Sequence, residues 1–137
     1  MKIKLDPGAV MPTRAHEFDA GLDLYAMEKT VIKPCDRATI STGVHAQIPK
    51  GFVGLLTSKS GLMAKEGITC RGTIDSGYVG SIHAVLFNHS HQYVTIEKGQ
   101  KITQLVILPI LNPELQVVED LDDTERGEGG FGSSGKF

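Results

Sequence analysis

The stretch SIHAVLFN, residues 81–88, decides the fold class. Its side chains alternate between two faces, as a β-strand with one buried face requires. One face carries Ile82, Ala84 and Leu86, and the other carries His83, Val85 and Phe87. We therefore expect a strand that packs its first face in the core.

Short segments of the same kind run along most of the chain. They are rich in β-branched residues and comprise residues 2–5, 22–26, 30–34, 37–48, 52–58, 92–98, 101–108 and 114–121. Glycine, proline and asparagine turn signals separate them. Many short strands at this spacing predict an all-β protein, a jelly-roll-like β-barrel. One short helix is expected within residues 57–67, with Ser58 or Ser60 as its N-cap and Gly67 at its end.

Length and composition fit one soluble domain. The chain has 137 residues, of which 40% are hydrophobic and 22% are charged, and its formal net charge is −2. This size can bury a core, and the charge argues against direct nucleic-acid binding. The longest apolar run, residues 105–111, is too short to span a membrane. Cys35 and Cys70 have neither CxxC nor zinc-site spacing, so we expect reduced thiols in the cytoplasm, or in the host cell interior for a viral protein.

The chain ends in the glycine-rich stretch GEGGFGSSG, residues 127–135, directly after Arg126. Glycine loses the most conformational freedom on ordering, and Phe131 alone buries too little surface to offset that loss. We therefore expect a β domain over residues 1–121 and a flexible C-terminal arm over residues 122–137. The arm is either a free end or a segment that becomes ordered on another surface.

Three stretches carry residues typical of chemistry, and each also has a plain structural reading. SKSG, residues 58–61, is either an anion site or the cap of the expected helix. Asp75 in GTIDSGY, residues 72–78, is either a reactive acid or an ordinary turn former. Asp23 interrupts an apolar strand, where an outward-facing acid is equally compatible. The histidines form no metal-binding pattern.

Together these stretches resemble the five ordered motifs of the trimeric dUTPase family, over nearly the whole chain. In order, the motifs correspond to AGLDLYA (20–26), SKSGLMAKEG (58–67), GTIDSGYVG (72–80), GQKITQL (99–105) and RGEGGFGSSG (126–135). Five motifs in order are far more specific than any one of them. Three positions depart from the usual pattern: Lys59 replaces an arginine, Gly77 replaces an acid, and Thr69 replaces the asparagine of many bacterial members.

The resemblance implies a fold, a reaction and an assembly. The fold is the jelly-roll-like, dUTPase-type β-clip. The reaction is the hydrolysis of dUTP to dUMP and pyrophosphate with Mg²⁺, which keeps uracil out of DNA and supplies dUMP for thymidylate synthesis. The assembly is a homotrimer with active sites at the subunit interfaces.

The resemblance also assigns roles to residues. Asp75 matches the carboxylate that activates the attacking water, and Tyr78 matches the ring that leaves no room for a ribose 2′-hydroxyl. Asp23 matches the acid that holds Mg²⁺ through water. The residues that match uracil-reading positions are Gly72, Thr73, Ile74 and His83, with Thr69 near the base. Those that match phosphate contacts are Lys59, Ser60, Gly61 and Gln104.

In the arm, Arg126 matches the ligand of the γ-phosphate and Phe131 matches the ring that covers uracil. Gly132, Ser133 and Ser134 match further substrate contacts. The physics agrees with these roles, since a triphosphate carries roughly four negative charges that cations and Mg²⁺ must offset. An aromatic ring on a flexible arm can stack on a base once the substrate is bound.

Two rival functions remain to be weighed. A dCTP deaminase shares the fold, but Val85 stands where that family has its catalytic glutamate, and its tail lacks the glycine-rich phenylalanine motif. The second rival is a non-catalytic, nucleotide-responsive protein that binds a regulatory partner, as some virus-encoded relatives do alongside catalysis. The presence of Asp75, Asp23 and Arg126 argues against a purely non-catalytic role.

Overall fold

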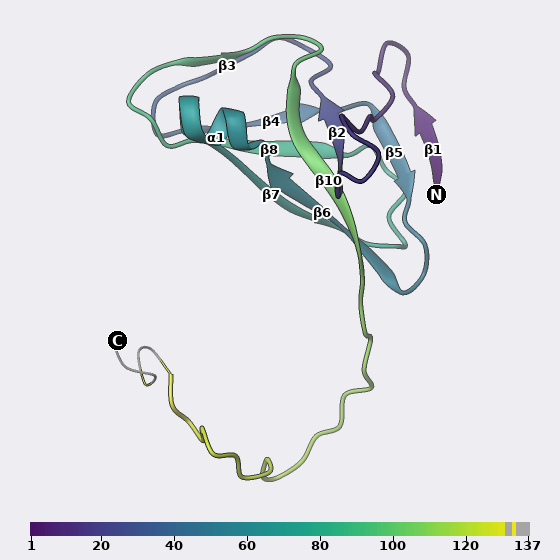
Figure 1. The fold of residues 1–137 in the computed structure, drawn as a ribbon, viewed down its shortest axis with the longest axis vertical. Helices are drawn as coiled ribbons and strands as arrows, with labels where there is room; N and C mark the ends of the chain where they lie inside the picture. The colour runs from purple at the N-terminus through teal and green to yellow at the C-terminus, as the bar shows by residue number, and fades with distance from the viewer. Residues whose placement is uncertain (131–132, 134–137) are drawn as a thin grey trace.

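The computed structural model of the chain describes residues 1–130 and residue 133. It consists almost entirely of strands with one short helix, which confirms the expected all-β class (Figure 1). The elements are β1 (Lys2–Leu5), β2 (Gly21–Tyr25), β3 (Thr30–Ile32), β4 (Arg37–Ser41), β5 (Val44–Gln47), β6 (Phe52–Ser58), α1 (Ser60–Glu66), β7 (Ile68–Ile74), β8 (His83–Asn88), β9 (Val94–Ile96) and β10 (Lys101–Pro109).

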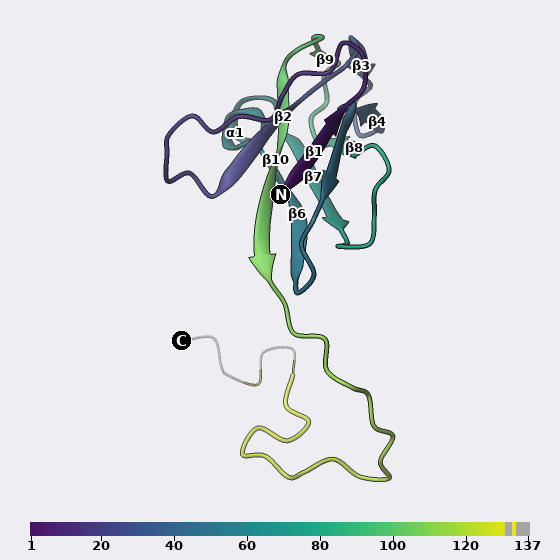
Figure 2. The same ribbon diagram turned by 90° about the vertical axis from the view of Figure 1, so that its right-hand side faces the viewer.

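Six strands form one sheet in the order β2-β10-β6-β7-β8-β4, and its neighbouring strands are antiparallel. Two small antiparallel sheets, β1-β5 and β3-β9, complete the fold. Figure 2 shows the strands of the large sheet curling rather than lying flat. A curled antiparallel sheet of this kind is the expected jelly-roll-like architecture.

The core is built by the alternation that the sequence predicts. Ile82, Ala84 and Leu86 are fully buried, while His83 and Phe87 on the opposite face are exposed. The same core contains buried aliphatic side chains from most other strands, among them Leu24, Ile40, Leu56, Ile96 and Leu105. One face of the curled sheet therefore encloses the hydrophobic core, and the other face and the loops are left for function.

The helix α1 ends as predicted but begins differently. Gly67 has a φ of 68° and its N–H bonds to carbonyls of the last turn, as a glycine C-cap does. At the start, Lys59 holds the N-cap position without a side-chain cap hydrogen bond. The prediction that Ser58 or Ser60 caps the helix is therefore wrong. The Ser58 hydroxyl instead joins β6 to β7, since it donates to the Cys70 carbonyl at 3.2 Å and accepts from the Cys70 N–H at 2.9 Å.

Three segments differ from the expected strands. Residues 37–48 divide into β4 and β5 at Thr42 and Gly43, because β4 pairs with β8 whereas β5 pairs with β1. Residues 68–74 form β7, which was not among the expected strands. Residues 114–121 form no strand in this chain, since no neighbouring strand pairs with them. An alternating pattern is not sufficient without a partner edge.

After β10 the chain leaves the sheet and runs away from it (Figure 1). Leu111, Leu115, Val117 and Leu121 in this segment are each at least 87% exposed. Exposed apolar side chains in such a row are unusual for a segment without a partner. Among the residues that the structure describes, no helix is long and apolar enough to cross a membrane.

Candidate active site

The loop between β7 and β8 encloses a small hollow of about 260 Å³, called here the hairpin hollow. It is lined by Thr73, Ile74, Asp75, Tyr78, Ile82 and His83. All but Ile82 are among the predicted site residues. Two adjacent strands and their connecting loop thus bring these residues to one place, as nearness in sequence allows.

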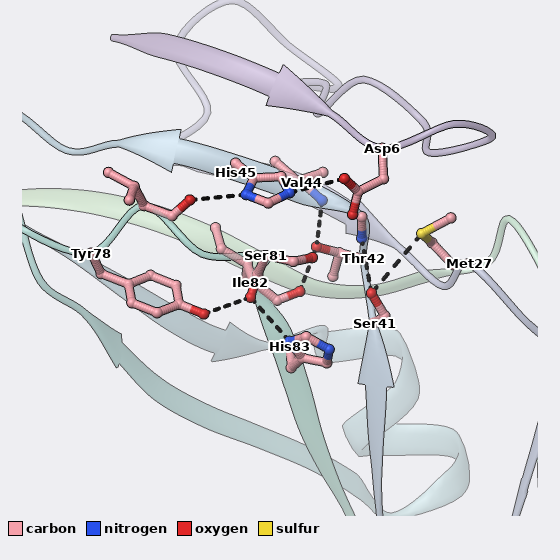
Figure 3. A network of polar contacts seen from close by, with 12 residues as sticks. Asp6, Met27, Ser41, Thr42, Val44, His45, Tyr78, Ser81, Ile82 and His83 are labelled. Carbon is pink, nitrogen blue, oxygen red and sulfur yellow. Dashed lines mark hydrogen bonds and ion pairs between the residues drawn. The ribbon is translucent and has the colours of Figure 1, made fainter.

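Two side chains of the hollow converge on one carbonyl oxygen. The Tyr78 hydroxyl donates to the Ser81 oxygen at 2.8 Å, and Nδ1 of His83 lies 3.0 Å from the same oxygen (Figure 3). A carbonyl oxygen only accepts, so His83 carries its proton on Nδ1 and leaves Nε2 available. The Tyr78 ring lies against Gly80, where an added Cβ would come within 2.6 Å of the tyrosine Cζ.

Asp75 lies at the start of this loop and is exposed. In the described part of the chain, no ion pair or side-chain hydrogen bond engages its carboxylate; its carbonyl accepts the Tyr78 N–H at 3.0 Å. An unengaged carboxylate next to a hollow can accept a hydrogen bond, or a proton, from a bound water.

A second group of polar side chains, called here the Asp23 cluster, comprises Asp23, Lys59, Lys101 and Gln104. Asp23 is only 3% exposed, and its two carboxylate oxygens lie 2.6 Å from Nζ of Lys59 and 2.7 Å from Nζ of Lys101. Gln104 on β10 is the cross-strand partner of Asp23 on β2. Asp23 is therefore an inward-facing, doubly paired acid, and the outward-facing reading is wrong.

The two lysines set the charge state of Asp23. Burial by itself raises the pKa of this carboxyl, but the hydrogen bonds and positive charges of Lys101 and Lys59 outweigh burial and hold the pKa below its ordinary value of 3.8. The hydrogen bond to Asp23, together with its negative charge, raises the pKa of Lys101. The cluster thus holds two cations on one anion and carries a net positive charge.

Lys101 is the site residue that sequence reasoning missed. From the sequence, Lys101 could point to solvent like any polar strand residue. Its pairing with Asp23 depends on a register shift in β10 between Lys101 and Thr103, which a simple alternation does not reveal. The only local signal in the sequence for Lys101 is its place after Gly99 and Gln100, at the start of a strand.

The hairpin hollow and the Asp23 cluster lie at opposite ends of β6 and β7. Ile74, beside Asp75, pairs with Gly54 near the start of β6, whereas Lys59 directly follows its end. Gly54 and Lys59 are five residues apart along the chain, which corresponds to roughly 16 Å in a strand. Figure 1 likewise shows α1 and the β7–β8 loop at opposite ends of these strands.

The remaining predicted residues are distributed among three places. Ser60 and Gly61 begin α1 next to Lys59. Thr69 and Gly72 line a separate groove of about 680 Å³ on the sheet face, where the Thr69 hydroxyl lies 2.7 Å from Nε2 of His89. In the arm, Arg126 Nε donates to the Gly129 carbonyl at 2.7 Å, and Ser133 lies in a turn. The predicted contacts Phe131, Gly132 and Ser134 lie outside the described residues.

Comparison with known proteins places this geometry in a family. A model of the dUTPase family matches residues 8–135. A deoxyuridine 5′-triphosphate nucleotidohydrolase of Clostridium kluyveri is 45% identical over 135 residues, which cover 96% of this chain and 94% of that protein. A homologous nucleotidohydrolase of Nautilia profundicola is 44% identical and covers 97% of this chain and 96% of that protein.

Solved structures of dUTPases are also similar to this chain. The dUTPase of Staphylococcus bacteriophage 80alpha with dUpNHpp has a TM-score of 0.92 at 38% identity, over 98% of both chains, and is described in connection with phage dUTPases that control transfer of virulence genes. A mutant dUTPase from phage phi11 of S. aureus, described with a structural Mg(II) ion, has a TM-score of 0.81 at 34% identity over 87% of this chain and 96% of that one. Because a family model and close relatives match almost the whole length, this chain belongs to the dUTPase family.

Proposed function

We propose that Asp75 activates the water that hydrolyses dUTP to dUMP and pyrophosphate in this member of the dUTPase family, which is a dUTP diphosphatase. The observation that carries the proposal is an exposed carboxylate without an ion partner among the described residues, at the edge of the hairpin hollow. A carboxylate held in this way suits the removal of a proton from a positioned water.

The hairpin hollow supplies selectivity for the nucleoside. Its size of about 260 Å³ fits a small group rather than a whole nucleotide, and the backbone of Thr73 and Ile74 borders it. Backbone donors and acceptors in a fixed hairpin can read the edge of uracil. The Tyr78 ring, held by its hydroxyl and packed on Gly80, leaves room for a deoxyribose and excludes a 2′-hydroxyl.

The Asp23 cluster supplies the charge that a triphosphate needs. Lys59 and Lys101 offset more than the single charge of Asp23, so they can turn toward phosphate oxygens when these arrive. Gln104 and the N–H groups of Ser60 and Gly61, beside Lys59, add donors. Lys59 in place of the usual arginine keeps the charge but loses the two-pronged donor geometry.

Mg²⁺ is the metal of the dUTPase family, and its fit to this chain depends on Asp23. Carboxylate oxygens suit Mg²⁺, which retains several waters and often takes its other ligands from phosphates. Lys59 and Lys101 engage both oxygens of Asp23, so the ion would reach this carboxylate through water, once the lysines have turned toward the phosphates. Within the described residues, no group of three His, Cys, Asp or Glu side chains could hold a metal ion. The bound ion would neutralise charge on the phosphates.

We further propose that a complete site forms between copies in a homotrimer. The hollow and the cluster lie roughly 16 Å apart along β6 in one chain, so the hollow of one copy would face the Asp23 cluster of a neighbour. The exposed apolar residues after β10 support association, since no described part of their own chain covers them.

The arm would then close over the assembled site. Arg126 provides a cation near the γ-phosphate, and the following glycines allow an extended path. A truncation after Glu125 should lower kcat/KM for dUTP by about a hundredfold, because closure excludes water and adds a phosphate contact. Full turnover by the truncated protein, with an intact assembly by light scattering, would contradict this role.

We place the reaction in the cytoplasm, or in the infected cell for a virus-encoded chain, in line with two free cysteines among the described residues. A regulatory partner is a second candidate function, favoured by the 38% identity to the 80alpha dUTPase, which is described with phage dUTPases that control transfer of virulence genes. Partner binding that survives Asp75→Asn while hydrolysis is lost would support it.

The main test is pyrophosphate release from dUTP, dTTP, dCTP and UTP with Mg²⁺. We expect fast release from dUTP alone, reduced about a thousandfold by Asp75→Asn, because the amide cannot take the proton of water. Asp36→Asn is the matched control, since Asp36 is an exposed acid whose carboxylate, among the described residues, accepts only from the Arg37 N–H at 2.8 Å. Unchanged release by Asp75→Asn would refute the base, and ammonia from dCTP would indicate a deaminase.

A further inference from the structure

One histidine connects the N-terminal strands to the loop of the hairpin hollow. His45 on β5 has Nδ1 at 2.9 Å from the Val79 carbonyl oxygen and Nε2 at 3.0 Å from a carboxylate oxygen of Asp6 (Figure 3). Its side chain is only 19% exposed. His45 on β5 thus links Asp6, directly after β1, to Val79, the residue that follows Tyr78.

The Val79 contact fixes which ring nitrogen of His45 donates. A carbonyl oxygen only accepts, so Nδ1 carries a proton and donates to Val79. Nε2 faces a carboxylate oxygen of Asp6, and this contact is an ion pair when the ring is protonated. His45 thus holds the Val79 carbonyl at one side of its ring, and Asp6 lies at the other.

The other hydrogen bonds of this loop lie within it or at its end, whereas His45 bonds to its middle. Inside the loop, Tyr78 bonds to Asp75 and Ser81. The end of the loop is anchored at Ile82, whose N–H donates to the Val44 carbonyl at 2.8 Å. Among the described residues, His45 is the one side chain from outside the loop that hydrogen-bonds to any of residues 76–80.

We propose that His45 is a positioning residue that holds Val79, and thereby the Tyr78 ring, in the place that excludes a ribose 2′-hydroxyl. The inference rests on the proposed role of Tyr78 in sugar selection. The turn N–H bond and the Tyr78 hydroxyl define the shape of the loop, and among the described residues the His45 hydrogen bond is the one that ties its middle to the β1–β5 pair. Without it the loop can shift as a unit while its internal bonds survive.

The experiment measures kcat and KM for dUTP and UTP in wild type and in two variants. His45→Phe fills the space without donors, and we expect the preference for dUTP over UTP in kcat/KM to fall about tenfold. His45→Gln has both of its N–H donors on one nitrogen and cannot reach Val79 and Asp6 as two separate ring nitrogens do, so its preference should lie between those of wild type and His45→Phe. His16→Phe, which replaces an exposed histidine, should leave the preference unchanged. A residue that only stabilised the fold would change the amount of active protein but not this ratio.

Tyr78→Ala, alone and combined with His45→Phe, separates failure of the proposal from failure of its premise. If Tyr78→Ala lowers the preference and adding His45→Phe lowers it no further, both residues act through one element, as proposed. If Tyr78→Ala lowers the preference but folded His45→Phe and His45→Gln do not, the positioning role is overturned and the role of Tyr78 stands. If Tyr78→Ala keeps the wild-type preference, the sugar-selection premise is wrong and the inference falls with it.

Discussion

The hairpin hollow and the Asp23 cluster contribute to one proposed site by different physics. The hollow is formed by a single loop and its flanking strands, and its acid Asp75 is exposed without an ion partner among the described residues. The cluster joins three separate elements around Asp23, which is buried and paired with Lys59 and Lys101. In the proposed site the first would select by shape and backbone contacts, and the second by charge.

Because the two regions differ in this way, substitutions in each should impair different properties of the enzyme. Changes in the hollow should alter which nucleoside is accepted and whether water is activated, with little effect on stability. Changes in the cluster should alter phosphate binding and stability together, because a buried ion pair that loses one partner leaves an uncompensated charge. Both expectations concern one active site only if the hollow of one copy meets the Asp23 cluster of another copy.

Mixing variants tests that condition and has the largest expected effect. Asp75→Asn damages the hollow, and Lys59→Met removes a cluster cation while keeping side-chain length. Each protein alone should be nearly inactive. Refolded together at equal amounts, they should recover activity in about a quarter of the sites, because random assembly pairs an intact hollow with an intact cluster that often. Pyrophosphate release from dUTP, measured per protomer, reports the recovery.

The control for mixing uses two variants of the same cluster, Lys59→Met and Gln104→Ala. Neither chain then carries an intact cluster, so mixing should restore nothing. Recovery in this control would show that Lys59 and Gln104 of one site come from different chains. No recovery in the first mixture, despite mixed assemblies by mass spectrometry, would place the hollow and the cluster of one site in the same chain.

Gly80→Ala probes the hollow alone. The new methyl group would meet the Tyr78 ring, since an ideal Cβ lies 2.6 Å from its Cζ. We expect the ring to move and the preference for dUTP over UTP to fall about tenfold, with melting temperature nearly unchanged. Gly77→Ala is the matched control in the same loop, because no atom lies within 4 Å of its added Cβ and neither glycine has a positive φ. Equal effects of the two variants would show that loop flexibility matters rather than the ring.

The hollow was more predictable from sequence than the cluster, for a physical reason. Asp75, Tyr78 and His83 lie within nine residues, so one loop brings them together and one motif contains them. The pairing of Asp23 with Lys59 and Lys101 depends on the register of β2, β6 and β10, which long-range packing decides. Motif order predicted Asp23 and Lys59 as site residues, but not their contact.

The strands show the same limit. Strict alternation predicted β8, because each side chain faces either the core or the outside. It missed β7, in which Cys70, Arg71 and Gly72 interrupt the usual β-branched composition, although pairing with β6 and β8 holds the segment extended. It also predicted a strand over residues 114–121, where the pattern is present but no strand of the described residues pairs with it. Whether such a segment forms a strand depends on a neighbouring strand to pair with, and its own residue pattern is not sufficient.

Asp23→Asn tests the charge of the Asp23 cluster and has the smallest expected effect. The pKa of Asp23 lies below its ordinary value of 3.8, so the folded protein releases this proton more readily than the unfolded chain. The ionised, paired carboxylate therefore contributes stability above pH 3.8, and that contribution is lost as the pH falls through the lower pKa of the folded state. Asn keeps the shape but cannot provide the charge.

At pH 7 we expect Asp23→Asn to lower the free energy of unfolding by about 1 kcal/mol, a modest figure because water screens the partly exposed lysines. The difference from wild type should shrink as the pH is lowered below 3.8. Urea unfolding at fixed protomer concentration measures both, since assembly makes stability depend on concentration. Glu97→Gln, which breaks the exposed Lys29–Glu97 pair, should change stability little at either pH. A gap that stays constant with pH would mean that the amide disturbs packing, and that charge does not distinguish the cluster from the hollow.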